Sequence, residues 1–308
     1  MTRAYVAFAF LCAVFGTTFG AIEIGIADGW PPLLAAGARF ALAGAIVLAF
    51  AAARGELRRV GREEIVAIVA IALSVTAGTF GALYSAERVL PSGLAALLSA
   101  TSPLFAVVIG IAQRRRAFDA SVVVGVGLGT LGVALVAGMG SANDLGTRWA
   151  AAAIVVSEIG YAWGLSRARA ASARMPMLQL AGAQQLVGGL VLLALSLVFE
   201  HRGPTHAGVA GIAALAYLVV VASAGAHTVS IWLASRTNAT FATSWTYVSP
   251  FLALAVGALF LREPIGASAW LGGVLVVAAA VALNRDARAS LTLRPSTPAA
   301  SPVRGGRS

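Results

Sequence analysis

Long apolar runs separated by short polar segments dominate the pattern of this chain. A helix needs roughly 20 apolar residues to cross about 30 Å of hydrocarbon, and ten runs approach or reach that length. The pattern therefore predicts ten transmembrane helices. The alternative count of nine merges two short runs and would leave a charged loop inside the membrane. The predicted spans are Ala4–Ala27, Pro32–Ala53, Ile65–Tyr84, Gly93–Ala112, Ser121–Met139, Trp149–Ser166, Met177–Phe199, Val209–Leu233, Phe241–Leu261 and Ala267–Leu283.

Composition supports a membrane protein over a soluble one. Charged residues make up 11% of the 308 residues, against about 25% in soluble domains, while hydrophobic residues reach 59% and the mean hydropathy is +0.87. A soluble fold of this size could not bury that much apolar surface. The single cysteine, Cys12, excludes a disulfide framework and a cysteine metal site. We expect neither a metal nor a cofactor.

The basic residues indicate membrane topology and not nucleic-acid binding. All 22 are arginine, and they lie singly or in short clusters between apolar runs. Because arginine concentrates in cytoplasmic loops, the distribution predicts that both termini lie in the cytoplasm and that the chain is a multi-pass protein of the inner membrane. With that orientation, 17 arginines lie inside, four lie outside (Arg88, Arg148, Arg202 and Arg262), and Arg39 falls within a span.

The segment 285–308 differs from the rest of the chain. It holds five arginines, three prolines and one acidic residue, with almost no large apolar side chains. This composition predicts a disordered basic cytoplasmic tail. Its expected partner is the anionic surface of the lipid bilayer.

Two stretches of the first half recur in the second. Pro31–Phe50 matches Pro176–Leu195 at an offset of 145 residues, and Ser102-Pro103 falls on Ser249-Pro250 at an offset of 147. Chance matching of alanine- and glycine-rich segments does not explain two proline registers at nearly the same offset. The repeat divides the chain into 1–140 and 141–284, each with five spans. Since five is odd, the second copy must cross the membrane in the opposite sense.

Three segments resemble the EamA type of the drug/metabolite transporter superfamily. They are FGTTFGAIEIGIADGWPPLLAAGARFALAG, PSGLAALLSATSPLFAVVIG and WTYVSPFLALAVGALFLREPIGASAWLGGVLVVAAAVAL. The chain departs from that family at Glu23, at Arg114–Arg116 and at Ala183-Gln184. The resemblance implies an all-α fold of ten helices in two inverted five-helix repeats. It also implies export of a small organic metabolite, such as an amino acid, a related metabolite or a drug, by a secondary active transporter.

Arg39 and Gln184 are the first candidates for a substrate site. The offset of 145 residues makes their positions equivalent in the two repeats, so each half offers one hydrogen-bonding side chain to a shared interface. Arg39 could hold an anionic substrate group with its fork of donors. The alternative is a structural ion pair with Glu23 on the neighbouring span.

Glu158 lies halfway along its predicted span, close to the membrane midplane. An ionisable group at that depth costs about 2.5–3.5 kcal/mol or more, so it is a functional candidate by default. Such a carboxyl suits proton coupling or substrate sensing. The alternative is a neutral carboxyl that only fixes helix packing through a hydrogen bond.

Aromatic residues and prolines complete the candidate set. His227, Tyr161, Trp163 and Trp245 could line a cavity for an amphipathic metabolite, although aromatic belts at membrane interfaces are common. Pro103 and Pro250 predict kinks in the fourth and ninth spans that could act as hinges.

Other classes of function receive less support from the sequence. The chain has no metalloprotease motif, no pair of membrane aspartates and no Ser–His dyad, so we do not expect an enzyme. The sequence shows neither the backbone selectivity filter nor the ring of charged side chains that is typical of a channel. A scaffold or receptor and a facilitative exchanger stay open as alternatives. The expected partners are a small-molecule substrate, protons and the bilayer, a homodimer is compatible with the sequence, and nucleic acid is not expected.

Overall fold

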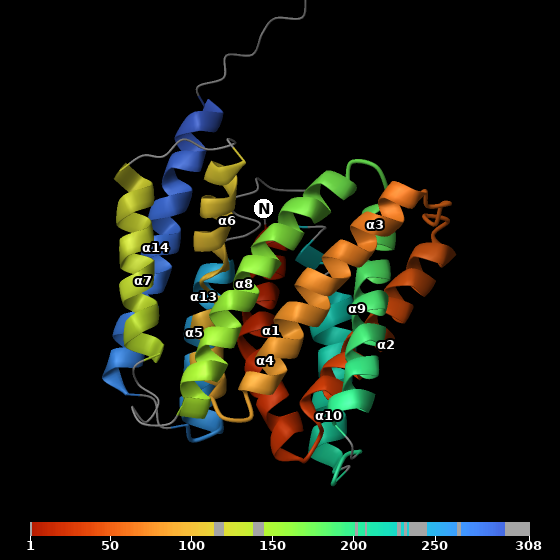
Figure 1. Ribbon diagram of the computed structural model, residues 1–308, viewed down its shortest axis with the longest axis horizontal. Helices are drawn as coiled ribbons and strands as arrows, with labels where there is room; N and C mark the ends of the chain where they lie inside the picture. Colours follow the sequence, from red (N-terminus) through yellow and green to blue (C-terminus); the bar gives the residue numbers. More distant parts are fainter. Residues whose placement is uncertain are drawn as a thin grey trace, which may run out of the picture.

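The computed structural model is a bundle of helices that run alongside one another (Figure 1). It describes residues 2–113, 120–137, 145–200, 203–206, 208–226, 229–230, 233, 245–263 and 266–292, and every regular element in these ranges is helical. The elements of the first half are α1 (Thr2–Ala27), α2 (Pro32–Ala53), α3 (Arg62–Ile71), η1 (Ala72–Phe80), α4 (Gly81–Ala86), α5 (Ser92–Ser99), α6 (Ser102–Ala112) and α7 (Ala120–Ala137). Those of the second half are α8 (Leu145–Ala171), α9 (Met177–Phe199), α10 (Val209–Tyr217), η2 (Leu218–Gly225), α13 (Trp245–Phe260) and α14 (Ala267–Thr292).

Within the described ranges, five helical segments are long and apolar enough to cross a membrane, so five of the ten predicted spans are clear by length and composition. They are Thr2–Ala27, Pro32–Ala53, Arg62–Ala86, Ser92–Ala112 and Met177–Phe199. Shorter apolar helices, Val122–Leu135, Val209–Gly225, Val248–Phe260 and Ala267–Ala279, correspond to four more. The remaining predicted span lies in α8, whose apolar sequence is interrupted by Arg148, Glu158 and Arg167.

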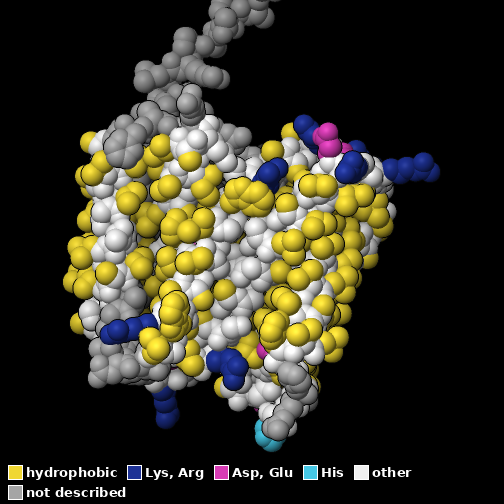
Figure 2. All heavy atoms as spheres, in the orientation of Figure 1, with side chains coloured by type: hydrophobic (Ala, Val, Ile, Leu, Met, Phe, Trp, Pro, Cys, Tyr) yellow, Lys and Arg dark blue, Asp and Glu magenta, His cyan; other side chains and the backbone are white. Residues whose placement is uncertain are grey.

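The surface agrees with a lipid environment. Figure 2 shows hydrophobic side chains over the sides of the bundle, with charged side chains near the two ends of the helices. Large apolar residues such as Leu197, Val209 and Phe260 are more than three-quarters exposed. Contiguous apolar surface of this extent is unfavourable in water and favourable against acyl chains.

Helix ends follow local sequence signals. α1 and α2 each end in a left-handed glycine, Gly29 (φ 86°) and Gly55 (φ 68°). In both cases the following residue donates back to the carbonyl five positions earlier: Trp30 to Gly25, and Glu56 to Ala51. This is the Schellman arrangement that glycine favours because it lacks a Cβ.

The two halves are interleaved in the bundle. The most extensive helix contacts join α2 to α9 and α7 to α14, so each pair combines one helix from either half. α1 packs against α13 and α10 of the second half, while α8 packs against α6 and η1 of the first. The largest buried cluster includes Leu11, Phe40, Tyr84, Ile154 and Leu254, and it crosses the boundary between the halves.

The end of the last helix differs from the prediction. Composition predicts a disordered tail from residue 285 onward, but α14 continues to Thr292. Alanine and arginine have high helix propensity, and they alternate with small polar residues through this stretch. The predicted disorder of 293–308 falls outside the described residues.

Candidate functional site

Arg39 is buried between the two halves of the chain. Its side chain projects from α2 and is only 3% exposed. Nε donates to the hydroxyl of Ser223 in η2 at 2.9 Å, and Nη1 donates to the hydroxyl of Tyr84 in α4 at 3.2 Å. The guanidinium also lies 4.7 Å from the ring centroid of Phe40 and 5.4 Å from that of Phe80. These are cation–π distances, so two hydroxyls and two aromatic rings hold the charge in place.

Gln184 makes the corresponding contact from the other half. It lies on α9, is 6% exposed, and its Oε1 accepts a 2.5 Å hydrogen bond from the hydroxyl of Thr76 in η1. Gln184 follows Arg39 by 145 residues, and Ser223 follows Thr76 by 147. The two contacts are therefore equivalent under the offsets of the repeat. In each, a polar side chain of one half meets a hydroxyl on the π-helix of the other half.

The π-helices are themselves related by the repeat. η1 begins at Ala72 between α3 and α4, and η2 begins at Leu218 directly after α10. A π-helical turn is rare, and such turns occur often at functional sites. Here each supplies the hydroxyl that meets Arg39 or Gln184. The pattern of residues does not predict either element, because both segments mix apolar residues with a few serines and threonines, as ordinary transmembrane α-helices do.

Close packing of α2 against α9 repeats in the same way. A Cβ on Gly44 would collide with the backbone nitrogen of Leu186, and a Cβ on Gly189 would collide with the backbone nitrogen of Ala41. Gly189 lies 145 residues after Gly44, and Leu186 lies 145 after Ala41. Each close contact between the two helices therefore occurs twice. This is the arrangement that a two-fold axis between α2 and α9 would produce.

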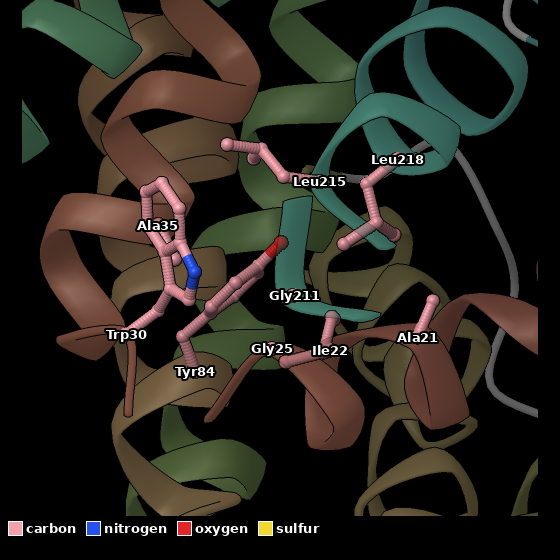
Figure 3. Close-up of a pocket in the computed structure, with 9 residues that line it drawn as sticks. All are labelled: Ala21, Ile22, Gly25, Trp30, Ala35, Tyr84, Gly211, Leu215 and Leu218. Atoms are coloured by element: carbon pink, nitrogen blue, oxygen red, sulfur yellow. The ribbon is translucent and has the colours of Figure 1, made fainter. Parts of the chain in front are cut away.

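A small closed cavity lies beside Tyr84. Its volume is about 10 Å³, and its lining includes Ile22, Trp30, Ala35 and Leu218. In Figure 3 the Tyr84 ring points between the Trp30 indole and Gly211 of α10. A volume near 10 Å³ is about the space of one water-sized probe. The cavity beside Tyr84 is therefore too small for a metabolite in this conformation.

Glu23 is not the ion-pair partner of Arg39 in this conformation. Ion pairs among the described residues include Arg54–Glu56, Arg58–Glu64 and Arg174–Glu63, all at or near the surface, and none joins Glu23 to Arg39. Glu23 has a buried Oε2 without a hydrogen-bond partner among the described residues. Glu87, which follows α4, is 2% exposed, and neither of its carboxyl oxygens has such a partner.

Glu158 lies at a separate polar site. It is 3% exposed on α8, and its carboxyl lies beside the side chains of Ser99 and Ser102. These two serines end α5 and begin α6, so the helix break at Ala100-Thr101 presents hydroxyls to the carboxyl. Tyr161 lies three residues further along α8 and packs on an apolar cluster that includes Ile71 and Val75.

The structure does not bring the predicted aromatic residues together around one cavity. The Trp163 ring stacks under the Arg167 guanidinium at 4.8 Å, and Trp245 stacks on Phe15 at 4.1 Å. His227 lies outside the described residues. Pro103 stands in the first turn of α6, after the break, whereas Pro250 lies inside α13. Whether these prolines act as hinges stays a prediction.

Two carboxylates that sequence reasoning missed join the halves at one end of the bundle. Glu200 follows α9 and accepts hydrogen bonds from the backbone N–H groups of Leu33 and Leu34 at 2.8 and 2.9 Å. Glu263 follows α13 and accepts hydrogen bonds from the N–H groups of Ser92 and Gly93 at 2.7 and 3.1 Å. The first turns of α2 and α5 each have a proline at the N-cap and no side-chain cap. A helix start without its own cap needs acceptors from elsewhere, and this was the signal that could have revealed both residues.

The equivalent helix start in the second half is held differently. α9 also follows a proline, Pro176, but no carboxylate of the described residues is paired with its first turn. Instead the Gln179 side chain accepts from the N–H of Arg58 at 3.2 Å and donates to the Arg58 carbonyl at 2.7 Å. A cavity of about 450 Å³ lies at the end of the bundle that holds Glu200 and Glu263, called the carboxylate end below. Its lining includes Trp30, Arg88 and Glu200.

Comparison with known proteins shows which family and which fold this chain is similar to. The profile of the EamA-like transporter family matches residues 3–138 and again residues 148–285. The chain is 30% identical over 274 residues to the uncharacterized inner membrane transporter YedA of Escherichia coli K12, covering 87% of this chain and 86% of the relative. It is 23% identical over 288 residues to the uncharacterized transporter YvbV of Bacillus subtilis, covering 94% and 93%. A crystal structure at 18% identity superposes with a TM-score of 0.64 over 94% of this chain and 99% of the solved chain, a likeness of fold alone.

Proposed function

Because the chain belongs to the EamA-like transporter family, we propose that it is a secondary active transporter of the inner membrane that exports a small organic metabolite. The substrate class is an amino acid, a related metabolite or a drug. Transport proceeds by alternating access between two inverted halves, residues 1–140 and 141–284, with both termini in the cytoplasm. The observation that carries this proposal is the pair of equivalent contacts, Arg39 with Ser223 and Gln184 with Thr76.

Equivalent contacts matter because an inverted repeat can open to either side by exchanging the conformations of its halves. The polar contacts lie where α2 and α9 meet the π-helices, so rocking of one half against the other must remake them. In the present conformation the cavity beside Tyr84, whose hydroxyl accepts a hydrogen bond from Arg39, has about the space of one water molecule. The carboxylates Glu200 and Glu263 connect the halves at the predicted outer end.

Arg39 is the group that binds an anionic part of the substrate. A guanidinium has five donor N–H groups, and the hydrogen bonds to Ser223 and Tyr84 use two of them. A substrate carboxylate can take the others in a bidentate geometry. Glu158 is the second functional group and acts as a proton-coupling carboxyl, with Ser99 and Ser102 as its neighbours.

Uptake into proteoliposomes tests the proposal. Purified protein is reconstituted, a mixture of labelled amino acids is offered with and without an imposed pH gradient, and protein-free liposomes serve as the baseline. A transporter accumulates at least one labelled solute, and the gradient changes its rate. Retention equal to the protein-free baseline for amino acids and for a panel of amphipathic drugs would favour a scaffold or receptor.

Glu158→Gln tests the carboxyl within the same assay. The amide keeps the hydrogen-bonding shape beside Ser99 and Ser102 but cannot titrate. We expect transport by this variant to lose the part of its pH dependence that Glu158 contributes, while substrate still binds. A pH–rate profile and turnover equal to those of the wild type would leave Glu158 with a packing role only.

A further inference from the structure

Glu87 is a buried carboxyl that neither the family resemblance nor the proposed transport cycle uses. It stands immediately after α4, outside the apolar span Arg62–Ala86. The side chain is 2% exposed, and neither Oε1 nor Oε2 has a hydrogen-bond partner among the described residues. An ionised carboxylate without hydrogen bonds is very unfavourable away from water. The site therefore favours a carboxyl that carries a proton.

The charged groups around Glu87 come from several elements. Glu23 faces it from α1 and Glu263 from the segment after α13, while Arg39 faces it from α2. Tyr84 lies one turn earlier on α4 and accepts a hydrogen bond from Arg39. Burial raises the pKa of Glu87 well above its ordinary value, the charges of Glu23 and Glu263 raise that pKa further, and Arg39 lowers it.

The Glu263 carboxylate is already engaged. It accepts hydrogen bonds from the Ser92 hydroxyl at 2.6 Å and from the N–H groups of Ser92 and Gly93. Glu87 lies near this carboxyl, whose hydrogen-bond donors are already provided, but no group of the described residues donates a hydrogen bond to Glu87 itself. Glu23 also has one buried oxygen without a partner in that part of the chain. The geometry leaves Glu87 as the carboxyl of this group best placed to bind a proton.

We propose that Glu87 is a proton-binding site at the predicted outer end of α1 and α4, and that its occupancy is linked to the charge of Arg39. The proton comes from the aqueous phase, forms an O–H bond with a carboxyl oxygen and returns to water when the site opens. An anionic substrate group on Arg39 cancels the field that favours the carboxylate, so substrate and proton bind together by reciprocal linkage. This link to substrate rests on the proposed function, whereas the protonation of Glu87 does not.

Infrared spectroscopy of the reconstituted protein tests the protonation directly. The carbonyl stretch of protonated carboxyls is followed across pH in the wild type, in Glu87→Gln and in Arg39→Gln, with Glu56→Gln, from a surface ion pair, as the matched control. We expect the wild type to keep a protonated carboxyl well above pH 4.3, about the ordinary pKa of glutamate. Glu87→Gln should lose one component of that signal, with the rest left to other buried carboxyls such as Glu158, and Glu56→Gln should keep all of it. Arg39→Gln should move the midpoint of that component to higher pH.

Thermal unfolding supplies a second measurement that needs no substrate. At low pH Glu87 is protonated in both the folded and the unfolded chain. As pH rises above about 4.3, the unfolded chain releases this proton while the folded chain keeps it, so stability falls until the folded pKa is passed. Glu87→Gln should remove this part of the decline.

The outcomes separate the two proposals. A wild-type protein without a protonated carboxyl at neutral pH would overturn the inference. It would equally be overturned if the signal of Glu87→Gln equals that of the wild type, or if Arg39→Gln leaves unchanged the midpoint of the component that Glu87→Gln removes. Should Glu87→Gln fail to fold, the shift of the titration midpoint in Arg39→Gln still tests the proposal. An intact titration in a protein that transports nothing would count against the proposed function alone.

Discussion

The Arg39–Ser223 and Gln184–Thr76 contacts have the same geometry and different chemistry. Both join α2 or α9 to a π-helix of the opposite half, and both are buried. Around Arg39 lie the rings of Phe40 and Phe80 and the hydroxyl of Tyr84, whereas Gln184 makes a neutral hydrogen bond to Thr76. The backbone frame of the two halves can thus be equivalent while one of them alone places a positive charge at this contact. The pseudo-symmetric helix arrangement suits rocking of one half against the other. The single positive charge at Arg39 suits recognition of an anionic substrate group.

A second contrast lies at the helix starts. Glu200 places a carboxylate on the first turn of α2, and the equivalent turn of α9 is held by the neutral Gln179. A carboxylate is favoured at a helix N-terminus by the helix dipole and by unpaired N–H groups. The two helix starts are therefore held by different chemistry, with a charged carboxylate at the predicted outer end and a neutral amide at the opposite end. Arg39→Gln and Glu200→Gln each remove the charged member of one of these two pairs. The glycine substitutions test the helix packing that the two halves share.

Arg39→Gln should have the largest effect, because it gives the first half the side chain of the second. Loss of a charge-assisted hydrogen bond costs about 1.5–3 kcal/mol, which corresponds to a rise in KM of about tenfold to a hundredfold. Concentration-dependent uptake into proteoliposomes measures it. Arg54→Gln, which removes a surface arginine paired with Glu56, is the matched control. Unchanged KM in Arg39→Gln would show that the charge plays no part in recognition.

Gly44→Ala and Gly189→Ala test whether the two repeat-related close contacts between α2 and α9 are equivalent. Each added Cβ meets backbone of the facing helix, and overpacking of this kind costs about 1–3 kcal/mol. We expect both variants to lower the melting temperature in detergent by a similar amount. Gly127→Ala on α7 is the control, since nothing lies within 4 Å of a Cβ there. A large effect at one glycine and none at the other would refute the two-fold relation.

Glu200→Gln should have the smallest effect of the three. The amide keeps one acceptor oxygen, so the N–H of either Leu33 or Leu34 loses its hydrogen bond, and the charge is removed as well. The expected cost is about 0.5–1.5 kcal/mol. We expect the predicted outer end to open more often. Labelling of Ala35→Cys, in the lining of the small cavity, should become a few times faster from outside in a Cys12→Ser background. A labelling rate equal to that of the same protein with Glu200 intact would contradict a closing role.

Much of the repeated helix arrangement could be predicted from the sequence, but only part of the chemistry at the candidate site could be. The offset of 145 residues identifies Arg39 and Gln184 as equivalent positions without any coordinates. Their partners Ser223 and Thr76 were not predicted, because a π-helix shifts side chains relative to an α-helical register and segments of this composition show no sign of it. Span counting also reached its limit at α8, where Glu158 and several arginines lower the apolar signal.

The missed acids share one cause. Glu87, Glu200 and Glu263 lie at the ends of helices, where sequence reasoning assigns charged side chains to water. The fold instead buries Glu87 and directs the other two to helix starts of the opposite half. Such partners are far apart in sequence: Glu200 and Leu33 are separated by 167 residues. A single sequence carries no direct signal for contacts of that kind.

Distances between the halves at both ends of the bundle test alternating access most directly. Spin labels at Val89 and Phe199 would report the carboxylate end, and labels at Leu57 and Met177 the opposite end; all four side chains are exposed. Double electron–electron resonance on reconstituted protein then compares the Glu200→Gln background with the unsubstituted one. Alternating access predicts reciprocal change, with the first distance lengthening as the second shortens. Both distances lengthening together, or neither changing while Ala35→Cys labelling accelerates, would contradict it.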